Sequence, residues 1–231
     1  MGTLILILVG EGVNAACSLK KTKAEGSGWL ANTFGWGLAV MCGVFVAHDS
    51  GAHLNPAVSI GLATAGQFEW AMVGPYIVAQ MLGGFCGAVL MYLFYIDHFK
   101  VTEDKATKLG IFCTAPAIKN NWNNLYCEIV ATFVLLFCVM CFGTYGATSA
   151  VVNIGADSAL PVTLLIMAIG MGLGATTGYA LNAARDIAPR FAHFVLPIPG
   201  KGDSQWGYAW VPICGPIIGA VLAAVVFNAI F

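Results

Sequence analysis

Two short stretches of the 231-residue sequence are the most informative about its fold: GAHLNPAVSI at residues 51–60 and GYALNAARDI at residues 178–187. Both have glycine at the first position, leucine and asparagine at the fourth and fifth, alanine at the seventh and isoleucine at the tenth. Each stretch follows two long apolar segments in its own half of the chain. The sequence therefore predicts an internal repeat, in which each half carries one helix that is too short to cross a membrane.

The rest of the chain is too apolar for a soluble protein. Hydrophobic residues make up 59% and charged residues 9%, against about 25% charged residues in soluble domains. The net charge is −1 with no basic tract, which argues against a nucleic-acid partner. The composition predicts an all-α membrane protein with six spanning helices, because a run of about 20 apolar residues crosses the hydrocarbon layer. The predicted spans are residues 2–19, 29–47, 71–96, 129–146, 160–177 and 206–231.

The order of the segments predicts how the two halves are related. We expect one transmembrane channel domain over residues 1–231, with repeat one at about 1–97, a polar linker at about 98–122 and repeat two at about 123–231. Three spanning helices per half is an odd number, so the second half enters the membrane from the opposite face. An inverted 3+3 repeat of this kind places its site near the midplane, where the short helices at 55–65 and 182–193 meet.

The residues that begin the two short helices have the chemistry of helix caps. Asn55 and Asn182 are good N-caps, and Pro56 suits a first helical position because its missing N–H needs no partner there. Two helix N-termini at the midplane carry about half a positive charge each, which opposes the passage of cations and protons. We expect the two side-chain amides to face the lumen and donate to a passing oxygen; the alternative is that each asparagine only caps its helix.

These two stretches and the architecture around them closely resemble the major intrinsic protein family, the aquaporins and aquaglyceroporins. The resemblance covers nearly the whole chain and implies six transmembrane helices, two half-membrane helices and a multi-pass homotetramer in the plasma membrane, with one pore per subunit and no cofactor. The second signature has alanine where the family has proline, which leaves the cap intact because alanine is a good helix former. The signature residues are Asn55, Pro56, Ala57, Asn182, Ala183 and Ala184.

The resemblance implies a selectivity filter on the extracellular side, built by Trp36, Gly170, Tyr179 and Arg185. Strict water channels usually carry histidine at the position of Gly170, so glycine is expected to leave space there. Trp36 and Tyr179 would form an apolar corner for the carbons of a polyol, and Arg185 would donate hydrogen bonds to its hydroxyls. Asp186 matches the aspartate of glycerol-conducting members and would brace the arginine side chain or the loop backbone; the alternative is a solvated loop carboxylate.

The resemblance also implies a ladder of backbone carbonyls along the pore and a glutamate behind it. His53 would line the inner vestibule or be a packed, hydrogen-bonded histidine. Glu128 matches the family glutamate that holds loop carbonyls in place, and Glu11 is not an obvious substitute for its counterpart in the first half. The predicted carbonyl residues are Gly51, Ala52, His53, Leu54, Gly178, Tyr179 and Ala180.

The distribution of charge conflicts with the orientation that the family implies. All ten lysine and arginine residues follow the first, third or fifth predicted span. The positive-inside tendency predicts that these segments are cytoplasmic, whereas the resemblance implies that they are extracellular. We keep the family orientation as the prediction.

Taken together, the sequence predicts a passive channel rather than an enzyme. The expected partners are glycerol, water, other small neutral solutes and the lipid bilayer. A water-selective channel is the nearest alternative, and an ion-coupled secondary transporter is the alternative from another class. We expect no metal site, because the one C-x-x-C motif, at residues 138–141, has no carboxylate or histidine nearby. Urea, dihydroxyacetone, lactic acid and arsenite stay open as solutes.

Overall fold

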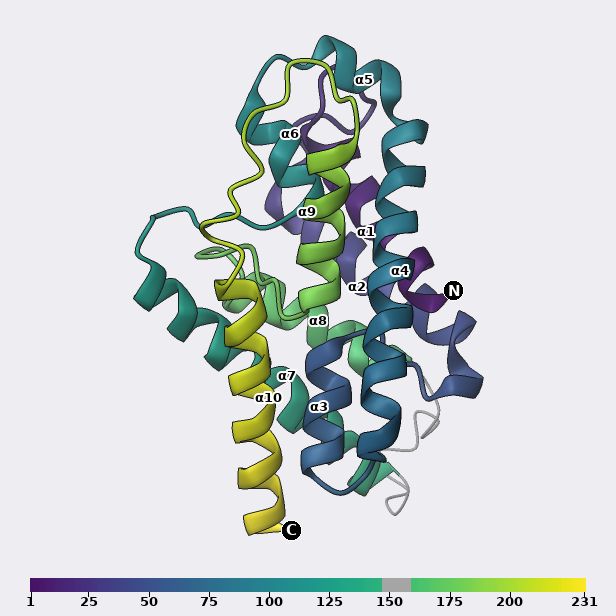
Figure 1. The fold of residues 1–231 in the computed structure, drawn as a ribbon, viewed down its shortest axis with the longest axis vertical. Helices are drawn as coiled ribbons and strands as arrows, with labels where there is room; N and C mark the ends of the chain where they lie inside the picture. Colours follow the sequence, from purple (N-terminus) through teal and green to yellow (C-terminus); the bar gives the residue numbers. More distant parts are fainter. Residues whose placement is uncertain (147–158) are drawn as a thin grey trace.

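The structure is a computed structural model that describes residues 1–146 and 159–231. The long helices surround two short ones, α3 and α9, near the centre of the molecule, and α5 and α6 lie at one end (Figure 1). A single 3-10 turn at His48–Ser50 precedes α3. The α-helices of the described residues are α1 (Gly2–Ser18), α2 (Gly28–Val46), α3 (Pro56–Thr64), α4 (Trp70–Phe94), α5 (Ile96–Val101), α6 (Lys105–Phe112), α7 (Asn121–Gly146), α8 (Leu160–Gly172), α9 (Ala183–Val195) and α10 (Val211–Ile230).

Four of these helices, α2, α4, α7 and α10, are long and apolar enough to cross a membrane. The apolar helices α1 and α8 are shorter, at 17 and 13 residues. Large apolar side chains such as Phe45, Leu82 and Leu222 are exposed on the outside, whereas Thr33 and Gln80 are buried inside. A protein surrounded by lipid has this arrangement, because the hydrocarbon layer solvates apolar side chains and leaves polar groups to bond one another.

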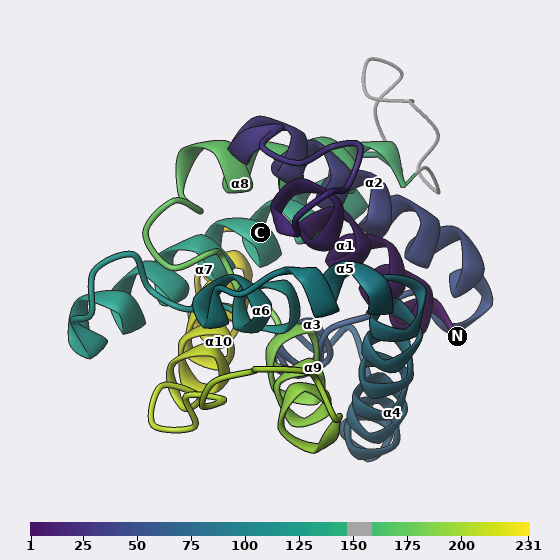
Figure 2. The same cartoon turned by 90° about the horizontal axis from the view of Figure 1, so that it is seen from above.

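The half-helices α3 and α9 lie end to end, as the side view and the view from above agree (Figures 1 and 2). Neither is long enough to span the bilayer, so each must be enclosed by protein. Gly84 on α4 makes one such enclosure possible, because a Cβ there would lie 2.7 Å from the backbone oxygen of Ala184 on α9. The close approach of these two helices therefore depends on a residue without a side chain.

Most predicted segments agree with the helices to within two residues, but three ends differ. α7 begins at Asn121 rather than at residue 129, because polar residues continue the helix beyond the apolar run. α8 ends at Gly172 rather than at residue 177, where the chain leaves the helix toward α9. α10 begins at Val211 rather than at residue 206, with Pro212 in its first turn, where a missing N–H costs nothing.

The linker between the repeats contains two helices, α5 and α6, that the sequence analysis did not predict. Asp104 caps α6 by accepting the backbone N–H of Thr107 at 2.6 Å. Leu109, Ile111 and Phe112 are buried, and α6 packs against α1 and α9. The local signal was present, because an aspartate directly before an amphipathic run is typical of a helix start. The linker thus folds back over one end of the molecule.

Candidate functional site: a midplane junction and an outer constriction

Both predicted asparagines cap their half-helices. The Oδ1 atom of Asn55 accepts the backbone N–H of Ala57 at 2.8 Å. The Oδ1 atom of Asn182 accepts the N–H groups of Ala184 at 2.9 Å and Arg185 at 3.1 Å. These bonds satisfy donors that a helix leaves unpaired in its first turn, and they turn each amide nitrogen away from its own helix.

The amide nitrogens of the same two side chains join the repeats. Asn55 donates from Nδ2 to the carbonyl oxygen of Leu181, and Asn182 donates from Nδ2 to that of Leu54, both at 2.8 Å. Each amide carries a second N–H, and both asparagines line a cavity. Capping is therefore only part of their role. In each asparagine, one of the two amide N–H groups bonds to the opposite repeat, which leaves the other for the lumen that we expected the amide to face.

The approach loops to the two half-helices have the same backbone shape. In both loops the first, second and fourth residues have a positive φ, a conformation that costs a residue with a side chain about 1 kcal/mol or more. Strain repeated at matching positions of two halves indicates a constrained functional backbone rather than an accident of sequence. The residues are Gly51 (72°), Ala52 (49°) and Leu54 (55°) in the first loop, and Gly178 (82°), Tyr179 (37°) and Leu181 (55°) in the second.

Two cavities meet at three of the four predicted filter residues, Trp36, Tyr179 and Arg185, which line both. The inner cavity has about 220 Å³ and the outer one about 410 Å³. Of the predicted carbonyl residues, six line the inner cavity and Gly178 lines the outer one. The rest of the inner wall is largely apolar, and includes Leu6, Val40, Val44, Leu135, Val139, Val162 and Ile166.

At this constriction an aromatic ring and a guanidinium group lie against each other. The Cζ atom of Arg185 lies 4.1 Å from the centre of the Trp36 ring. Arg185 also donates from Nη1 to the carbonyl oxygen of Phe112, the last residue of α6, at 3.3 Å. The C-terminal end of a helix carries partial negative charge, so α6 stabilises the cation that it holds.

Gly170 does not leave open space, and that expectation is wrong. A Cβ atom at Gly170 would lie 3.0 Å from Cζ of Tyr179 and 2.8 Å from Cγ2 of Thr33. Among the described residues, Gly170 lines neither cavity, whereas Tyr179 lines both. The ring of Trp29 packs edge-on against Tyr179 with centres 5.7 Å apart. The glycine therefore makes room for the tyrosine, and the tyrosine faces the lumen.

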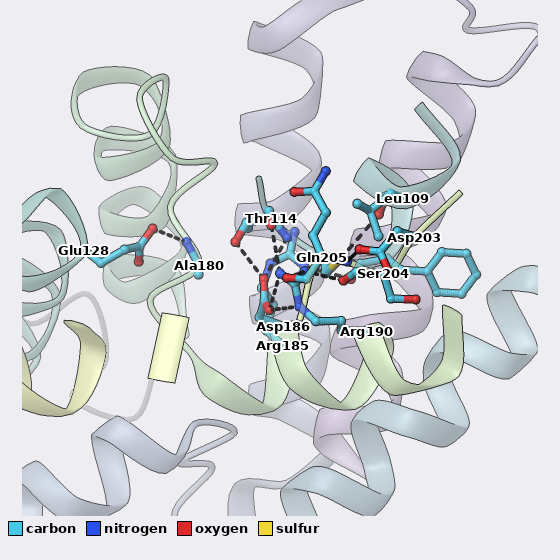
Figure 3. A network of polar contacts seen from close by, with 12 residues as sticks. Leu109, Thr114, Glu128, Ala180, Arg185, Asp186, Arg190, Asp203, Ser204 and Gln205 are labelled. Carbon is cyan, nitrogen blue, oxygen red and sulfur yellow. Dashed lines mark hydrogen bonds and ion pairs between the residues drawn. The ribbon is translucent and has the colours of Figure 1, made fainter. Parts of the chain in front are cut away.

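Glu128 holds the second approach loop from behind (Figure 3). Its Oε1 atom accepts the hydroxyl of Thr177 at 2.6 Å and the N–H of Ala180 at 3.0 Å, and its Oε2 atom accepts the N–H of Leu181 at 3.0 Å. A carboxylate can only accept, so Glu128 bonds to the N–H groups of the loop and not directly to its carbonyls. The loop carbonyls are oriented indirectly, because their peptide planes are held.

Asp186 pairs with Arg190, one turn further along α9, instead of Arg185. Its Oδ1 atom accepts Nε and Nη2 of Arg190 at 2.9 and 2.8 Å, and its Oδ2 atom accepts the N–H and the hydroxyl of Thr114, both at 2.7 Å. Asp186 and Arg190 are fully buried. The alternative of a solvated loop carboxylate is therefore wrong, while bracing of the loop backbone is observed.

Arg190 is a residue that the sequence analysis did not single out. It donates to the carbonyl oxygens of Ser204 at 2.8 Å, Gln205 at 3.2 Å and Thr114 at 2.9 Å, besides Asp186 (Figure 3). These bonds tie α9 to the linker and to the loop before α10. The signal for the pair was its spacing, because an aspartate and an arginine four residues apart face each other on a helix.

His53 combines the two roles that the sequence left open. It lines the inner cavity, and its Nδ1 atom lies 3.0 Å from the hydroxyl of Ser59, which also accepts from Gln80 at 3.1 Å. The ring packs against Phe68 and Tyr76, with centres 4.4 and 5.1 Å apart. The imidazole is therefore a wall residue held by its neighbours.

Several of the basic residues that conflict with the family orientation are committed to contacts within the protein. Lys108, Arg185 and Arg190 are buried. Lys201 donates to three carbonyl oxygens around the end of α9 at 2.6 to 2.7 Å. These contacts explain where four of the ten basic residues lie in the folded protein, but the positive-inside tendency counts loop lysines and arginines as such. The conflict therefore stands, and the orientation stays a prediction.

Comparison with known proteins agrees with this architecture. The sequence profile of the family Major intrinsic protein matches residues 1–227. A probable glycerol uptake facilitator protein of Thermotoga maritima is 51% identical over all of this chain and 97% of its own, and the glycerol uptake facilitator protein of Bacillus subtilis is 49% identical over all of this chain and 82% of its own. The crystal structure of the aquaglyceroporin from Plasmodium falciparum is similar with a TM-score of 0.80 and 29% identity, covering 98% of this chain and 91% of that one. The chain belongs to the major intrinsic protein family and is a multi-pass protein of the cell membrane with an aquaporin-like fold.

Proposed function

We propose that this chain is a passive channel for glycerol and other small neutral polyols, which also passes some water. The observation that carries the proposal is the contact of Arg185 with Trp36 where the two cavities meet. The Cζ atom of Arg185 lies 4.1 Å from the centre of the Trp36 ring. Glycerol has a row of CH groups and three hydroxyls. An aromatic face suits the carbons, and a guanidinium group, which can only donate, suits the hydroxyl oxygens.

The inner cavity offers the same two kinds of contact. Its lining combines the approach loops, Asn55 and Asn182 with a mainly aliphatic set of side chains from the surrounding helices. A polyol that passes along it keeps both hydrogen-bonding partners and apolar contact. The names of the two facilitator proteins quoted above point to the same solute.

The same groups explain the exclusion of ions and protons. The N-termini of α3 and α9 and the guanidinium of Arg185 place positive charge at two levels of the path. Cations and protons meet this potential, and the narrow, mostly apolar wall does not replace a hydration shell. We include in the proposal a homotetramer with one pore per subunit, which cross-linking in native membranes tests directly.

A water-selective channel is the second candidate, because one observation favours it. The ring of Tyr179 fills the space beside Gly170 that a wide filter would need. An ion-coupled transporter has less support. Glu128 is engaged by the loop, and within the part of the chain that the structure describes Glu11 is buried and lines neither cavity. A coupling carboxyl needs access to the path.

Stopped-flow light scattering of proteoliposomes tests the proposal. In a glycerol gradient we expect rapid shrinkage followed by re-swelling well above that of empty vesicles, with no dependence on membrane potential or proton gradient. Shrinkage without re-swelling would establish the water channel instead, and a dependence on potential would establish coupling. Urea, dihydroxyacetone, lactic acid and arsenite are measured in the same way to rank the solutes.

A pair of matched variants links the result to the constriction. Trp36→Phe is expected to change glycerol permeability about two- to fivefold, the effect of weakening one cation–π contact. Trp122→Phe is the control, because Trp122 is 78% exposed and lies outside both cavities. Equal permeability of the two variants would contradict the assignment of Trp36 to the constriction.

A further inference from the structure

One residue behind the constriction, Asn14 on α1, has no role in the function as proposed so far. It is buried, with 6% of its surface exposed, and it borders the outer cavity together with Trp36 and Arg185. An asparagine inside an apolar helix is unfavourable unless its amide is fully hydrogen-bonded. The hydrogen-bonding partners of Asn14 therefore indicate its role.

All the hydrogen-bonding capacity of the Asn14 amide is used. Its Oδ1 atom accepts the indole N–H of Trp36 at 2.8 Å and an amide N–H of Asn32 at 2.7 Å. Its Nδ2 atom donates to the carbonyl oxygens of Gly110 and Ile111 on α6 at 3.3 and 3.1 Å. An indole nitrogen only donates and a carbonyl only accepts, so these partners determine which end of the amide faces which way.

These contacts hold the Trp36 ring on two sides. Gly10, one turn before Asn14, lets the ring lie against α1, since a Cβ atom there would be 2.5 to 2.7 Å from three ring carbons. Arg185 lies over the ring at 4.1 Å. The indole N–H, the only polar group of the ring, is bonded to Asn14 and is therefore withdrawn from the solute.

We propose that Asn14 is a positioning residue that sets solute selectivity through Trp36. By accepting the indole N–H, Asn14 keeps the Trp36 wall apolar and fixes its place beside Arg185. Without this acceptor, the N–H of Trp36 has to turn toward water or a solute hydroxyl, and the division between an apolar and a donating wall is lost. The inference rests on the proposed function, because it concerns the filter of that channel.

The experiment measures the ratio of glycerol to water permeability in proteoliposomes. This ratio does not depend on how many channels fold, so a loss of folded protein alone would lower both permeabilities and leave it unchanged. An effect of Asn14 through α6, which holds Arg185 at the carbonyl of Phe112, is separated by the double-mutant cycle described next. For Asn14→Leu we expect the ratio to fall about fivefold, the weight of one hydrogen bond. Asn14→Ala is the second variant in case the leucine prevents folding, because the smaller side chain lets water from the outer cavity reach the α6 carbonyls.

A double-mutant cycle with Trp36→Phe decides whether Asn14 acts through the indole. Phenylalanine keeps an aromatic ring but has no N–H, so the Asn14 substitution should change the ratio of Trp36→Phe less than twofold. An equal change in both backgrounds, or an unchanged ratio in the single variant, would overturn the inference. Failure of the wild-type protein to pass glycerol would instead overturn the proposed function, and the cycle is then read on the urea-to-water ratio.

Discussion

The two half-helices reach the same geometry by different means. α3 begins with Pro56, and Asn55 caps it with one hydrogen bond. α9 begins with Ala183, and Asn182 caps it with two. The fixed φ of proline restrains the start of the half-helix in the first repeat, whereas an additional cap hydrogen bond restrains it in the second.

The surroundings of the two approach loops show the same contrast. Behind the second loop, the carboxylate of Glu128 accepts three hydrogen bonds, and the Asp186–Arg190 pair locks the helix that follows. The first loop is held by neutral contacts, such as the N–H of Ala52 donating to the carbonyl oxygen of Ala47 at 3.2 Å. In the described part of the chain, no carboxylate accepts from its N–H groups.

The largest effect is expected from breaking the ion pair of the second repeat. Arg190→Leu leaves Asp186 buried without a counter-charge, which should lower the free energy of unfolding by about 3–5 kcal/mol. Thermal unfolding of the purified protein in detergent measures it. The double variant Asp186→Asn, Arg190→Leu should recover part of the loss, because no charge is then stranded.

A surface ion pair serves as the control for this prediction. Lys100 and Asp97 are 2.7 Å apart but both are exposed, so Lys100→Met should leave the unfolding temperature unchanged. Equal effects of Lys100→Met and Arg190→Leu would show that the buried pair does not hold the second repeat.

A smaller effect is expected from weakening the clamp on the second loop. Glu128→Gln places an amide N–H where a carboxylate oxygen accepted, so one buried donor of the loop loses its partner. The cost should be about 1–3 kcal/mol in unfolding free energy, together with a loss of glycerol permeability per folded channel. Unchanged permeability with reduced stability would mean that the clamp supports the fold and not the pore.

The smallest effects should come from exchanging proline and alanine at the first positions of the two half-helices. Ala183→Pro should stabilise the protein by about 0.4–1 kcal/mol, because the cap bonds come from later residues and the alanine N–H is not needed. Pro56→Ala should destabilise it by a similar amount. If both substitutions destabilise equally, rigidity at the first position is not interchangeable between the repeats.

The sequence predicted the half-helices better than it predicted the side-chain contacts of the filter. The half-helices and their caps were predictable, since an asparagine before a short apolar run carries its own signal. The relation of Gly170 to Tyr179 was not, because glycine alone does not show which neighbour occupies its space. The partner of Asp186 was also missed, although the spacing signals it: Arg190, four residues further along α9, faces Asp186, whereas the adjacent Arg185 does not.

The class of the protein follows from its sequence: an apolar membrane chain with an inverted repeat and two capped half-helices. These features depend on run length, composition and caps, which act over a few residues. The hydrogen-bonding partner of each buried polar group depends instead on how the helices pack. Asn55 and Leu181 are 126 residues apart in the chain, and Asn14 and Ile111 on α6 are 97 residues apart. Such partners come within hydrogen-bonding distance only when the helices pack, so no local pattern records them.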